Sequence, residues 1–595
     1  MNASISKEGK AGAFPKPQPD NAMKENSVMN RSASPSPVLS GSRPTRRLQR
    51  ISCISFLVLM GTLLPEGICS QPAAMPAPLF EQLGSHHHPI TTRSKEAQRY
   101  FDQGLMLLYN FNHREAIRSF EAVATLDPEC AMAHWGVAFA HGPHINAPMG
   151  DDAIAPAWAA LQAAIARRGK AGPRERDYID ALAHRYVAPG KPHDRVALNE
   201  AFAKAMKSVA EAHPDDHDAT VLFVDAVMNT TPWDYWMPNR RDPKPVIADV
   251  LQRIDRVLAR DAEHPGANHL YIHLVEAGPE PARGLPSAAR LRRYAPAAGH
   301  LVHMPSHIYI RVGQYQDAVE ANEEAARADR QYISACRVQG FYPGAYYPHN
   351  LHFLWYAHLF QGQAQASLDS ARQVASYALS PMCGTPVVEK PRFTWLPLVT
   401  QLRFGRWDEV LGEARPAAEQ PFDQAVWRYA RARAFAARGD AKSAEREAQA
   451  LETLAESPEV KAVDNPAFPA SPTLQVARLL AKASVAQAKG DHAARIEHLR
   501  AAVDAEHNLP YMEPSFWWYP TRQTLAAALL KAGRAAEAER EFRLDLEEFP
   551  RNGWSLFGLL QALQVQRKTD AAALVEPEFK RAWSRSDVTL SLDWL

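Results

Sequence analysis

Apolar residues recur along most of the chain with the three- and four-residue spacing of amphipathic helices. From about Ser94 to the C-terminus, Ala-rich stretches of this kind alternate with short turns that carry Gly, Pro or Asp. The sequence contains no run of alternating β-branched residues that would predict a sheet. The pattern therefore predicts an all-α protein.

A period of about 34 residues, the length of a tetratricopeptide repeat (TPR), organises these helices. One copy has its small, aromatic and proline residues at Gly104, Ala116, Phe120 and Pro128. A later copy has them at Gly533, Ala538, Phe542 and Pro550, and Gly-centred turns recur between the two at Gly313, Gly362, Gly405, Gly439 and Gly490. Isolated helix pairs cannot bury their apolar faces alone. We therefore expect a TPR-type helix-turn-helix superhelical solenoid, with irregular insertions at 142–195 and 229–245.

The N-terminal region differs from the repeats in composition. Residues 1–42 are rich in Ser, Pro and Asn and are expected to be disordered. Residues 43–70 combine arginines with an apolar run at 51–64, which is short for a bilayer span and typical of a signal peptide. Export to the periplasm or outside the cell follows, the alternative being an uncleaved membrane anchor at 51–64. Residues 71–93 are interpreted as a linker, in which no function is expected of His86, His87 and His88.

The rest of the chain is divided into two TPR-like arrays, 94–390 with a His-rich groove and 391–595. Its charges are balanced, with 67 basic and 66 acidic residues and a net charge of +1. This balance gives no reason to expect nucleic acid as a partner. The sequence has no CxxC pair, HExxH motif, P-loop or GxGxxG motif, so it does not indicate a zinc knuckle, a zincin-type peptidase or a nucleotide site.

Histidines gather in the middle of the chain at helical spacing. His269, His273 and Glu276 stand at i, i+4 and i+7, which places them on one helix face. A second set stands at i, i+3 and i+7, namely His300, His303 and His307, and a third pair is His349 and His352. Phasing the repeats from Gly313 and Gly362 places the second and third sets on the first helix of neighbouring units, at positions that face the concave groove of TPR proteins. These five histidines, with Arg311, are the predicted groove residues.

Three interpretations of the histidines stay open. They can form a metal site, because neutral imidazoles at this spacing together with a carboxylate surround Zn²⁺, Cu²⁺ or Fe²⁺. The predicted ligands of such a divalent transition metal are His269, His273, Glu276, His300, His303 and His307. The histidines can instead line a polar ligand pocket as hydrogen-bond donors or acid–base groups, or they can cap and bridge turns. Pro305 either kinks one helix that carries the second set, or it stands in the first turn of a helix and leaves His300 and His303 on a preceding loop.

The sequence also resembles a known family. The residues that carry the resemblance are Gly104-Leu105, Asn112-His113, Ala116, Phe120, Asp127-Pro128, Asn268-His269, His273, Leu285-Pro286-Ser287, the block from Gly299 to Gly313, and Glu513-Pro514. They are similar to those of bacterial relatives of tetratricopeptide repeat protein 38, over most of 94–583. The family is described as TPR proteins without an established activity, so the resemblance implies a fold more than a function. His144 stands where relatives are expected to have Asn.

The function that we expect is that of a non-enzymatic scaffold or binding module, with a protein, peptide or small ligand in its concave groove. The alternative is a His-lined metal-binding protein or metal-dependent enzyme with its site within 269–352. A membrane is expected as a partner only through an uncleaved N-terminal segment.

Overall fold

The computed structural model describes residues 77–237, 240–336, 341–378, 393–465 and 468–595. These residues belong to one compact unit, which runs from Ala74 to Leu595. The predicted disordered extension, the signal or anchor segment at 43–70 and the predicted array boundary at 390 lie outside the described residues. No helix among the described residues is both long and apolar enough to cross a membrane.

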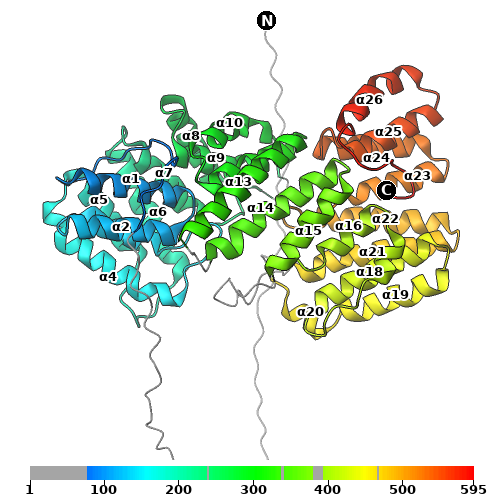
Figure 1. Ribbon diagram of the computed structural model, residues 1–595, viewed down its shortest axis with the longest axis horizontal. Helices are drawn as coiled ribbons and strands as arrows, with labels where there is room; N and C mark the ends of the chain where they lie inside the picture. The colour runs from blue at the N-terminus through cyan, green and yellow to red at the C-terminus, as the bar shows by residue number, and fades with distance from the viewer. Residues whose placement is uncertain (1–76, 238–239, 337–340, 379–392, 466–467) are drawn as a thin grey trace, which may run out of the picture. The chain divides into compact units, whose positions relative to one another are not determined.

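The described residues form α-helices joined by short turns (Figure 1). The first half contains α1 (Lys95–Tyr109), α2 (His113–Leu126), α3 (Ala131–Ala140), α4 (Asp151–Arg167), α5 (Pro173–Leu182), α6 (Arg195–Ala212), α7 (His217–Met228), α8 (Pro245–Arg260), α9 (Pro265–Glu276), α10 (Leu285–Tyr294), α11 (Gly299–His303), α12 (Pro305–Arg311) and α13 (Tyr315–Cys336). The second half contains α14 (Phe341–Phe360), α15 (Ala364–Ala378), α16 (Leu396–Arg403), α17 (Trp407–Gly412), α18 (Pro421–Ala437), α19 (Ala441–Ala455), α20 (Pro458–Ala462), α21 (Ala470–Ala488), α22 (His492–His507), α23 (Thr521–Lys531), α24 (Ala535–Glu548), α25 (Gly553–Val565) and α26 (Thr569–Ala582). Three short 3₁₀ helices complete the list: η1 (Arg168–Lys170), η2 (Ala183–Arg185) and η3 (Pro281–Gly284).

Consecutive helices pack as pairs, and each pair packs on the next. The most extensive packing is within pairs such as α1–α2, α18–α19, α21–α22 and α23–α24, while α18 and α19 also pack on α21 (Figure 1). The β contacts of the described residues are isolated bridges. The prediction of an all-α fold built from helix-turn-helix units is therefore confirmed.

The residues that define the repeat are packing residues. The ring of Phe120 on α2 lies against Gly104 on α1 and Gly136 on α3, where an added Cβ would come within 2.5 Å of ring atoms. Ala116 is completely buried in the same pair. The later copy uses the same contact, because a Cβ on Gly558 would come within 2.1 Å of Phe542. The glycines thus allow two neighbouring helices to approach one aromatic ring.

The predicted turn glycines are needed for their backbone conformation. Gly313, Gly362, Gly405, Gly439, Gly490 and Gly533 all have positive φ, from 66° at Gly405 to 77° at Gly439 and Gly533. An L-residue pays about 1–2 kcal/mol in this left-handed region. The turns that separate the two helices of a unit therefore select glycine.

The prediction of an irregular insertion at 142–195 is wrong for most of that segment. It contains α4 and α5, and Ala157, Leu161 and Ala164 form a buried stripe on α4. The segment is rich in Pro, Gly and Trp, but Pro156 lies in the second turn of α4 and the helix continues through it. Residues 229–237 and 240–244 contain no helix, as predicted for this segment, and Trp236 and Pro243 form an isolated bridge.

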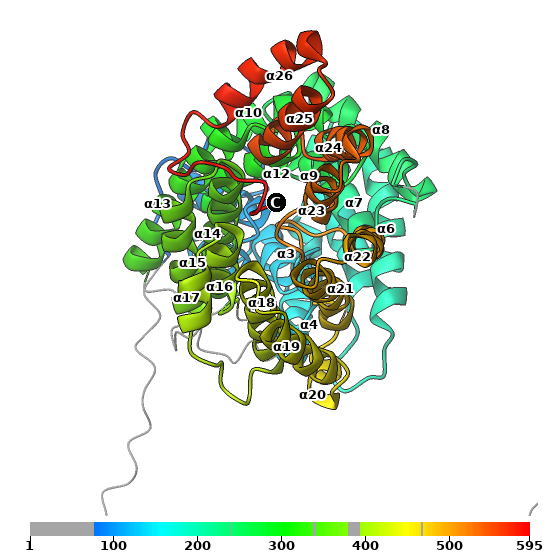
Figure 2. The same cartoon turned by 90° about the vertical axis from the view of Figure 1, so that its right-hand side faces the viewer.

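Helix α9 lies at the centre of the helices that carry the histidines. All of its residues are buried, and it packs against α1, α7, α8, α10 and α12. Figure 2 shows α9 next to α12. A helix that is covered on every side cannot line an open surface groove. The histidines on α9 are therefore interior residues.

Candidate metal centre

Four parts of the chain bring histidines and glutamates together inside the protein. Helix α9 contributes His269, His273 and Glu276, and α11 with α12 contributes His300, His303 and His307. Helix α14 contributes His349, and the segment before α23 contributes Glu513. We call these eight residues the histidine centre. Except for half-buried His349, all of them are at most 7% exposed.

The α11–α12 segment carries its three histidines on a helix with a single interruption. Met304 separates the two helices but keeps helical angles (φ −50°, ψ −37°), and Pro305 begins α12. The amide of Met304 still donates to the carbonyl of His300. His300 and His303 thus lie on a helix and not on a loop, although that helix is interrupted at Met304 before Pro305. His303 and His307 still lie on one side of it.

His269 and His273 face each other through their Nε2 atoms, which are 3.1 Å apart. His269 Nδ1 donates to the carbonyl of Tyr109 at 2.6 Å, and His273 Nδ1 donates to Glu276 Oε1 at 2.9 Å. A carbonyl or a carboxylate can only accept, so the proton of each neutral ring is on Nδ1. Burial lowers the pKa of both rings, and their mutual repulsion lowers that of His269 further. Two Nε2 lone pairs therefore point at each other.

His303 and His307 repeat this arrangement, with 2.9 Å between their Nε2 atoms. His303 Nδ1 lies 2.6 Å from Asn322 Oδ1, and Asn322 Nδ2 donates to the carbonyl of Ala318, which fixes the amide orientation. His307 Nδ1 lies 2.5 Å from Glu276 Oε2 and 3.0 Å from Glu513 Oε2. The hydrogen bond at His303 Nδ1 and the ion pairs at His307 Nδ1 are outer contacts of the kind that orient histidines which bind metals through the other nitrogen.

The charges around His307 differ from those around the first pair. Burial by itself lowers the pKa of His307, but Glu276 and Glu513 outweigh it and raise that pKa to about 10. Burial would raise the pKa of Glu276, but His307 and His273 lower it to about 2. Burial raises the pKa of Glu513, with repulsion from Glu276 added to it. The two carboxylates therefore favour the charged form of His307, whereas burial favours the neutral form of His269 and His273.

His300 has no hydrogen-bond partner for either ring nitrogen, although it is 1% exposed. Its ring centroid lies 4.9 Å from that of His269, and Phe111 stacks on it at 5.3 Å. One nitrogen from each of His269, His273 and His300 lies within 4.8 Å of the others. A buried imidazole without partners is costly unless something binds it.

The remaining predicted residues do not all join the histidine centre. His349 does, because its nitrogen lies within 4.8 Å of those of His303 and His307. His352, three residues on, lies instead against Trp355 and Phe393, and burial lowers its pKa to about 3. Arg311 donates to the backbone carbonyl of Glu276 at 3.0 Å and lines a cavity of about 90 Å³ beside Glu513.

The predicted location of the histidines in an open concave groove is wrong. His300, His303 and His307 are at most 1% exposed. The cause is that α9, α13 and α14 cover α11 and α12, so helix positions that face a groove in a regular repeat face an enclosed interior here. Sequence reasoning also missed Tyr109 and Asn322, which hold the rings, and it named Glu513 only among the residues of the family resemblance.

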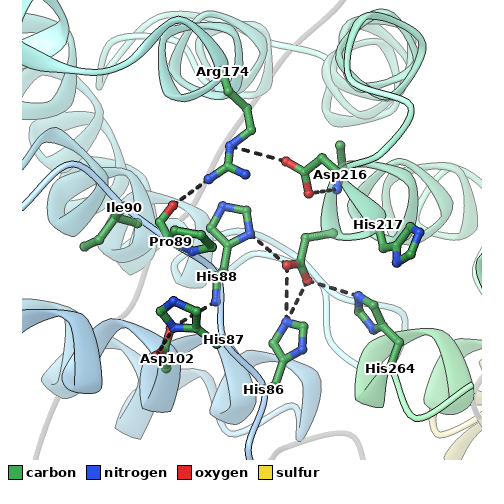
Figure 3. A network of polar contacts seen from close by, with 12 residues as sticks. His86, His87, His88, Pro89, Ile90, Asp102, Arg174, Asp216, His217 and His264 are labelled. Atoms are coloured by element: carbon green, nitrogen blue, oxygen red, sulfur yellow. Dashed lines mark hydrogen bonds and ion pairs between the residues drawn. The ribbon is translucent and has the colours of Figure 1, made fainter. Parts of the chain in front are cut away.

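A second histidine network lies nearby, in the segment that was predicted to be a linker. His86, His88 and His264 converge on the carboxylate of Asp218 (Figure 3). The distances are 3.0 Å from His86 Nε2, 2.7 Å from His88 Nδ1 and 3.2 Å from His264 Nε2, and the Tyr109 hydroxyl also donates to Asp218. We call this network the Asp218 clamp.

The Asp218 clamp attaches the N-terminal segment to the helices. Arg174 pairs with Asp216 at 3.5 Å and donates to the carbonyl of Pro89 at 2.5 Å (Figure 3). His87 points away from Asp218 and contacts Asp102 at 2.8 Å (Figure 3). Residues 77–93 are therefore part of the packed structure rather than a linker.

Comparisons with solved structures find matches of low structural similarity and low sequence identity. The model is similar to human IFIT1 in a dimer with m7Gppp-AAAA (TM-score 0.29, 12% identity, 83% of this chain and 91% of that chain). It is also similar to yeast Tom70 (TM-score 0.27, 12% identity, 84% and 94%) and to the TPR domain of P58(IPK) (TM-score 0.20, 12% identity, 80% and 99%).

The helix pairs of the chain itself define it as an all-α, TPR-like protein. No known protein family and no curated protein matches the sequence. The resemblance to relatives of tetratricopeptide repeat protein 38 stays a prediction.

Proposed function

We propose that this protein binds a divalent transition metal ion in the histidine centre, with His269, His273 and His300 as ligands. The observation that carries the proposal is the pair of Nε2 lone pairs 3.1 Å apart, with the unpartnered ring of His300 beside them. Two nitrogens bound tetrahedrally at about 2.0–2.1 Å from one Zn²⁺ are about 3.3 Å apart. The pair is thus already spaced as two ligands of one ion.

The chemistry of the ligands limits the choice of ion. Three neutral imidazoles without a thiolate suit Zn²⁺, Cu²⁺ or Fe²⁺ better than Mg²⁺ or Ca²⁺, which prefer oxygen ligands. Three protein ligands leave a position open for water or a small ligand. The nearby Glu276 holds His273 and supplies negative charge that offsets the ion. These features support a metalloprotein and leave open whether it catalyses a reaction.

Elemental analysis of protein produced without an affinity tag tests the proposal. We expect at least one bound ion per chain, lost on chelation and restored by added Zn²⁺, Cu²⁺ or Fe²⁺. In His269→Gln and His300→Gln uptake at this triad should be lost, whereas His193→Ala, a change at an exposed histidine, should leave it unchanged. Circular dichroism shows whether the variants keep their helices. Absence of bound metal together with no uptake of these ions contradicts the proposal.

The scaffold hypothesis concerns other residues. Helix-pair arrays present extended surfaces to protein or peptide partners, and such a partner stays a separate proposal for this chain. The buried histidines are not needed for it, so substitutions in the histidine centre should not weaken partner binding if the fold is kept.

Export and family membership are further parts of the proposal. The arginines and apolar run at 43–70 support export, with an uncleaved anchor at 51–64 as the alternative. Mass spectrometry of the N-terminus of the protein, recovered from separate cell fractions, distinguishes cleavage from anchoring.

The motifs from Gly299 to Gly313 support kinship with tetratricopeptide repeat protein 38, and they contain three of the histidines discussed here.

A further inference from the structure

We propose that His303, His307 and His349 bind a second divalent transition metal ion, so that the histidine centre holds two metal ions side by side. This inference rests on the proposed function and adds a separate set of ligands to it. The three residues offer one nitrogen each within 4.8 Å of one another, and none of them belongs to the first triad.

The second triad repeats the design of the first. Its two central rings have Nε2 atoms 2.9 Å apart. His303 Nδ1 is hydrogen-bonded to Asn322, and His307 Nδ1 faces the carboxylates of Glu276 and Glu513 as an ion pair. Asn322, which is completely buried, holds His303 with an amide that cannot turn around because its nitrogen donates to Ala318. The third ring, His349, lies with its centroid 4.8 Å from that of His303 and 5.8 Å from that of His307.

The two triads are neighbours that share one carboxylate. Glu276 Oε1 contacts His273 Nδ1 in the first triad, and Glu276 Oε2 contacts His307 Nδ1 in the second. The centroids of His273 and His307 are 5.6 Å apart, and those of His300 and His303 are 5.9 Å apart. One glutamate thus orients a ligand of each ion, which makes Glu276 a positioning residue for both sites.

Glu513 gives the second triad a feature that the first lacks. Its carboxylate lies 3.0 Å from His307 Nδ1, and it also lines the cavity of about 90 Å³ with Arg311 and Tyr511. The two glutamates together supply two negative charges against the charge of two divalent ions. These two carboxylates therefore offset half of the positive charge that two divalent ions would bring into the buried centre.

Metal stoichiometry of the full, untagged chain tests this inference. Apo-protein prepared with a chelator is titrated with Zn²⁺ alone, and bound zinc is measured after gel filtration. We expect two ions per chain, falling to one in His349→Gln and to one in His300→Gln. His349 is half-buried, so its replacement should disturb folding least; His303→Gln provides a second variant for the same triad, and His193→Ala should still bind two.

Loading with Cu²⁺ tests whether the ions are neighbours. Two adjacent Cu²⁺ ions couple magnetically, so the paramagnetic resonance signal should be smaller than the bound copper predicts, and it should recover in each single-triad variant. One ion per chain that is unaffected by His349→Gln and His303→Gln would overturn the second site while leaving the proposed function intact. Two ions with uncoupled signals, or two ions that survive those substitutions, would also overturn it. No ion at all would overturn both.

Discussion

The Asp218 clamp and the histidine centre are built from the same residue types arranged in opposite ways. In the clamp, three imidazoles and a tyrosine hydroxyl surround one carboxylate, so the negative charge is inside and the donors point at it. In the histidine centre the carboxylates stand outside, at Nδ1, and the Nε2 atoms point at each other. In the clamp a carboxylate already occupies the point that the imidazoles face, whereas no carboxylate lies between the paired Nε2 atoms of the centre. The number of histidines alone therefore does not distinguish a structural network from a candidate ligand site. The position of the carboxylate relative to the rings does.

The largest expected effect comes from removing the carboxylate at the centre of the clamp. Asp218→Ala leaves His86, His88, His264 and the Tyr109 hydroxyl without their shared acceptor. Breaking a buried charge network by removing one member costs about 3–5 kcal/mol. Urea unfolding of the metal-free protein should show a loss of this size. Asp215→Asn, at a neighbouring position that is 99% exposed, should change stability by less than about 0.5 kcal/mol.

A smaller effect is expected from Tyr109→Phe, which removes only the hydroxyl that donates to Asp218. Hydrogen bonds to charged groups contribute about 1.5–3 kcal/mol, so unfolding free energy should fall within that range. The backbone carbonyl that holds His269 remains, and bound metal should therefore be unchanged. Loss of both stability and metal would show that the ring itself positions the histidine centre.

Replacing a histidine by leucine should have opposite signs in the two regions. In metal-free protein His300→Leu removes two buried unpartnered nitrogens and should raise unfolding free energy by about 1–2 kcal/mol. His88→Leu removes a donor from Asp218 and should lower it by about 1–2 kcal/mol. Chemical unfolding in the presence of a chelator measures both. If both substitutions changed the unfolding free energy in the same direction, the contrast between the Asp218 clamp and the histidine centre would be contradicted.

The Asp218 clamp should also affect how the unfolding free energy depends on pH under acidic conditions. Burial alone would raise the pKa of Asp218, but hydrogen bonds from His264, His86 and His88 lower it well below its ordinary value. A depressed carboxyl pKa stabilises the fold above the unfolded-state pKa of about 4, and this stabilisation is lost as the pH falls below it. Asp218→Asn should therefore reduce the slope of unfolding free energy against pH below about pH 4 by up to about 1.4 kcal/mol per pH unit. An unchanged slope would indicate that Asp218 does not titrate there.

The fold was predictable because it follows from local patterns. The 34-residue period, the turn glycines and the aromatic contact of Phe120 are all written in short segments of sequence, and the structure contains each of them. The error at 142–195 arose because the Pro, Gly and Trp content of this segment was taken as a sign of irregular structure. A long Ala-rich apolar stripe outweighs one proline near a helix start.

The histidine centre was predictable only in part, because helix spacing fixes which residues share a face but not which faces meet. His269, His273, His300, His303 and His307 were found from spacing alone. Their burial depends on α9 being covered on all sides, which no segment of sequence reveals. Glu513 lies more than two hundred residues from His307, and Asn322 belongs to another helix. The phasing also treated His349 and His352 alike, whereas α14 turns only His349 towards the second triad.

Tyr109 takes part in both regions through different atoms. Its carbonyl holds His269, and its hydroxyl reaches Asp218, to which the segment at 77–93 is attached. Any coupling that passes through one residue is reciprocal. An ion that rigidifies Tyr109 would protect the N-terminal segment from proteases, and a cut in that segment would in turn speed the loss of the ion.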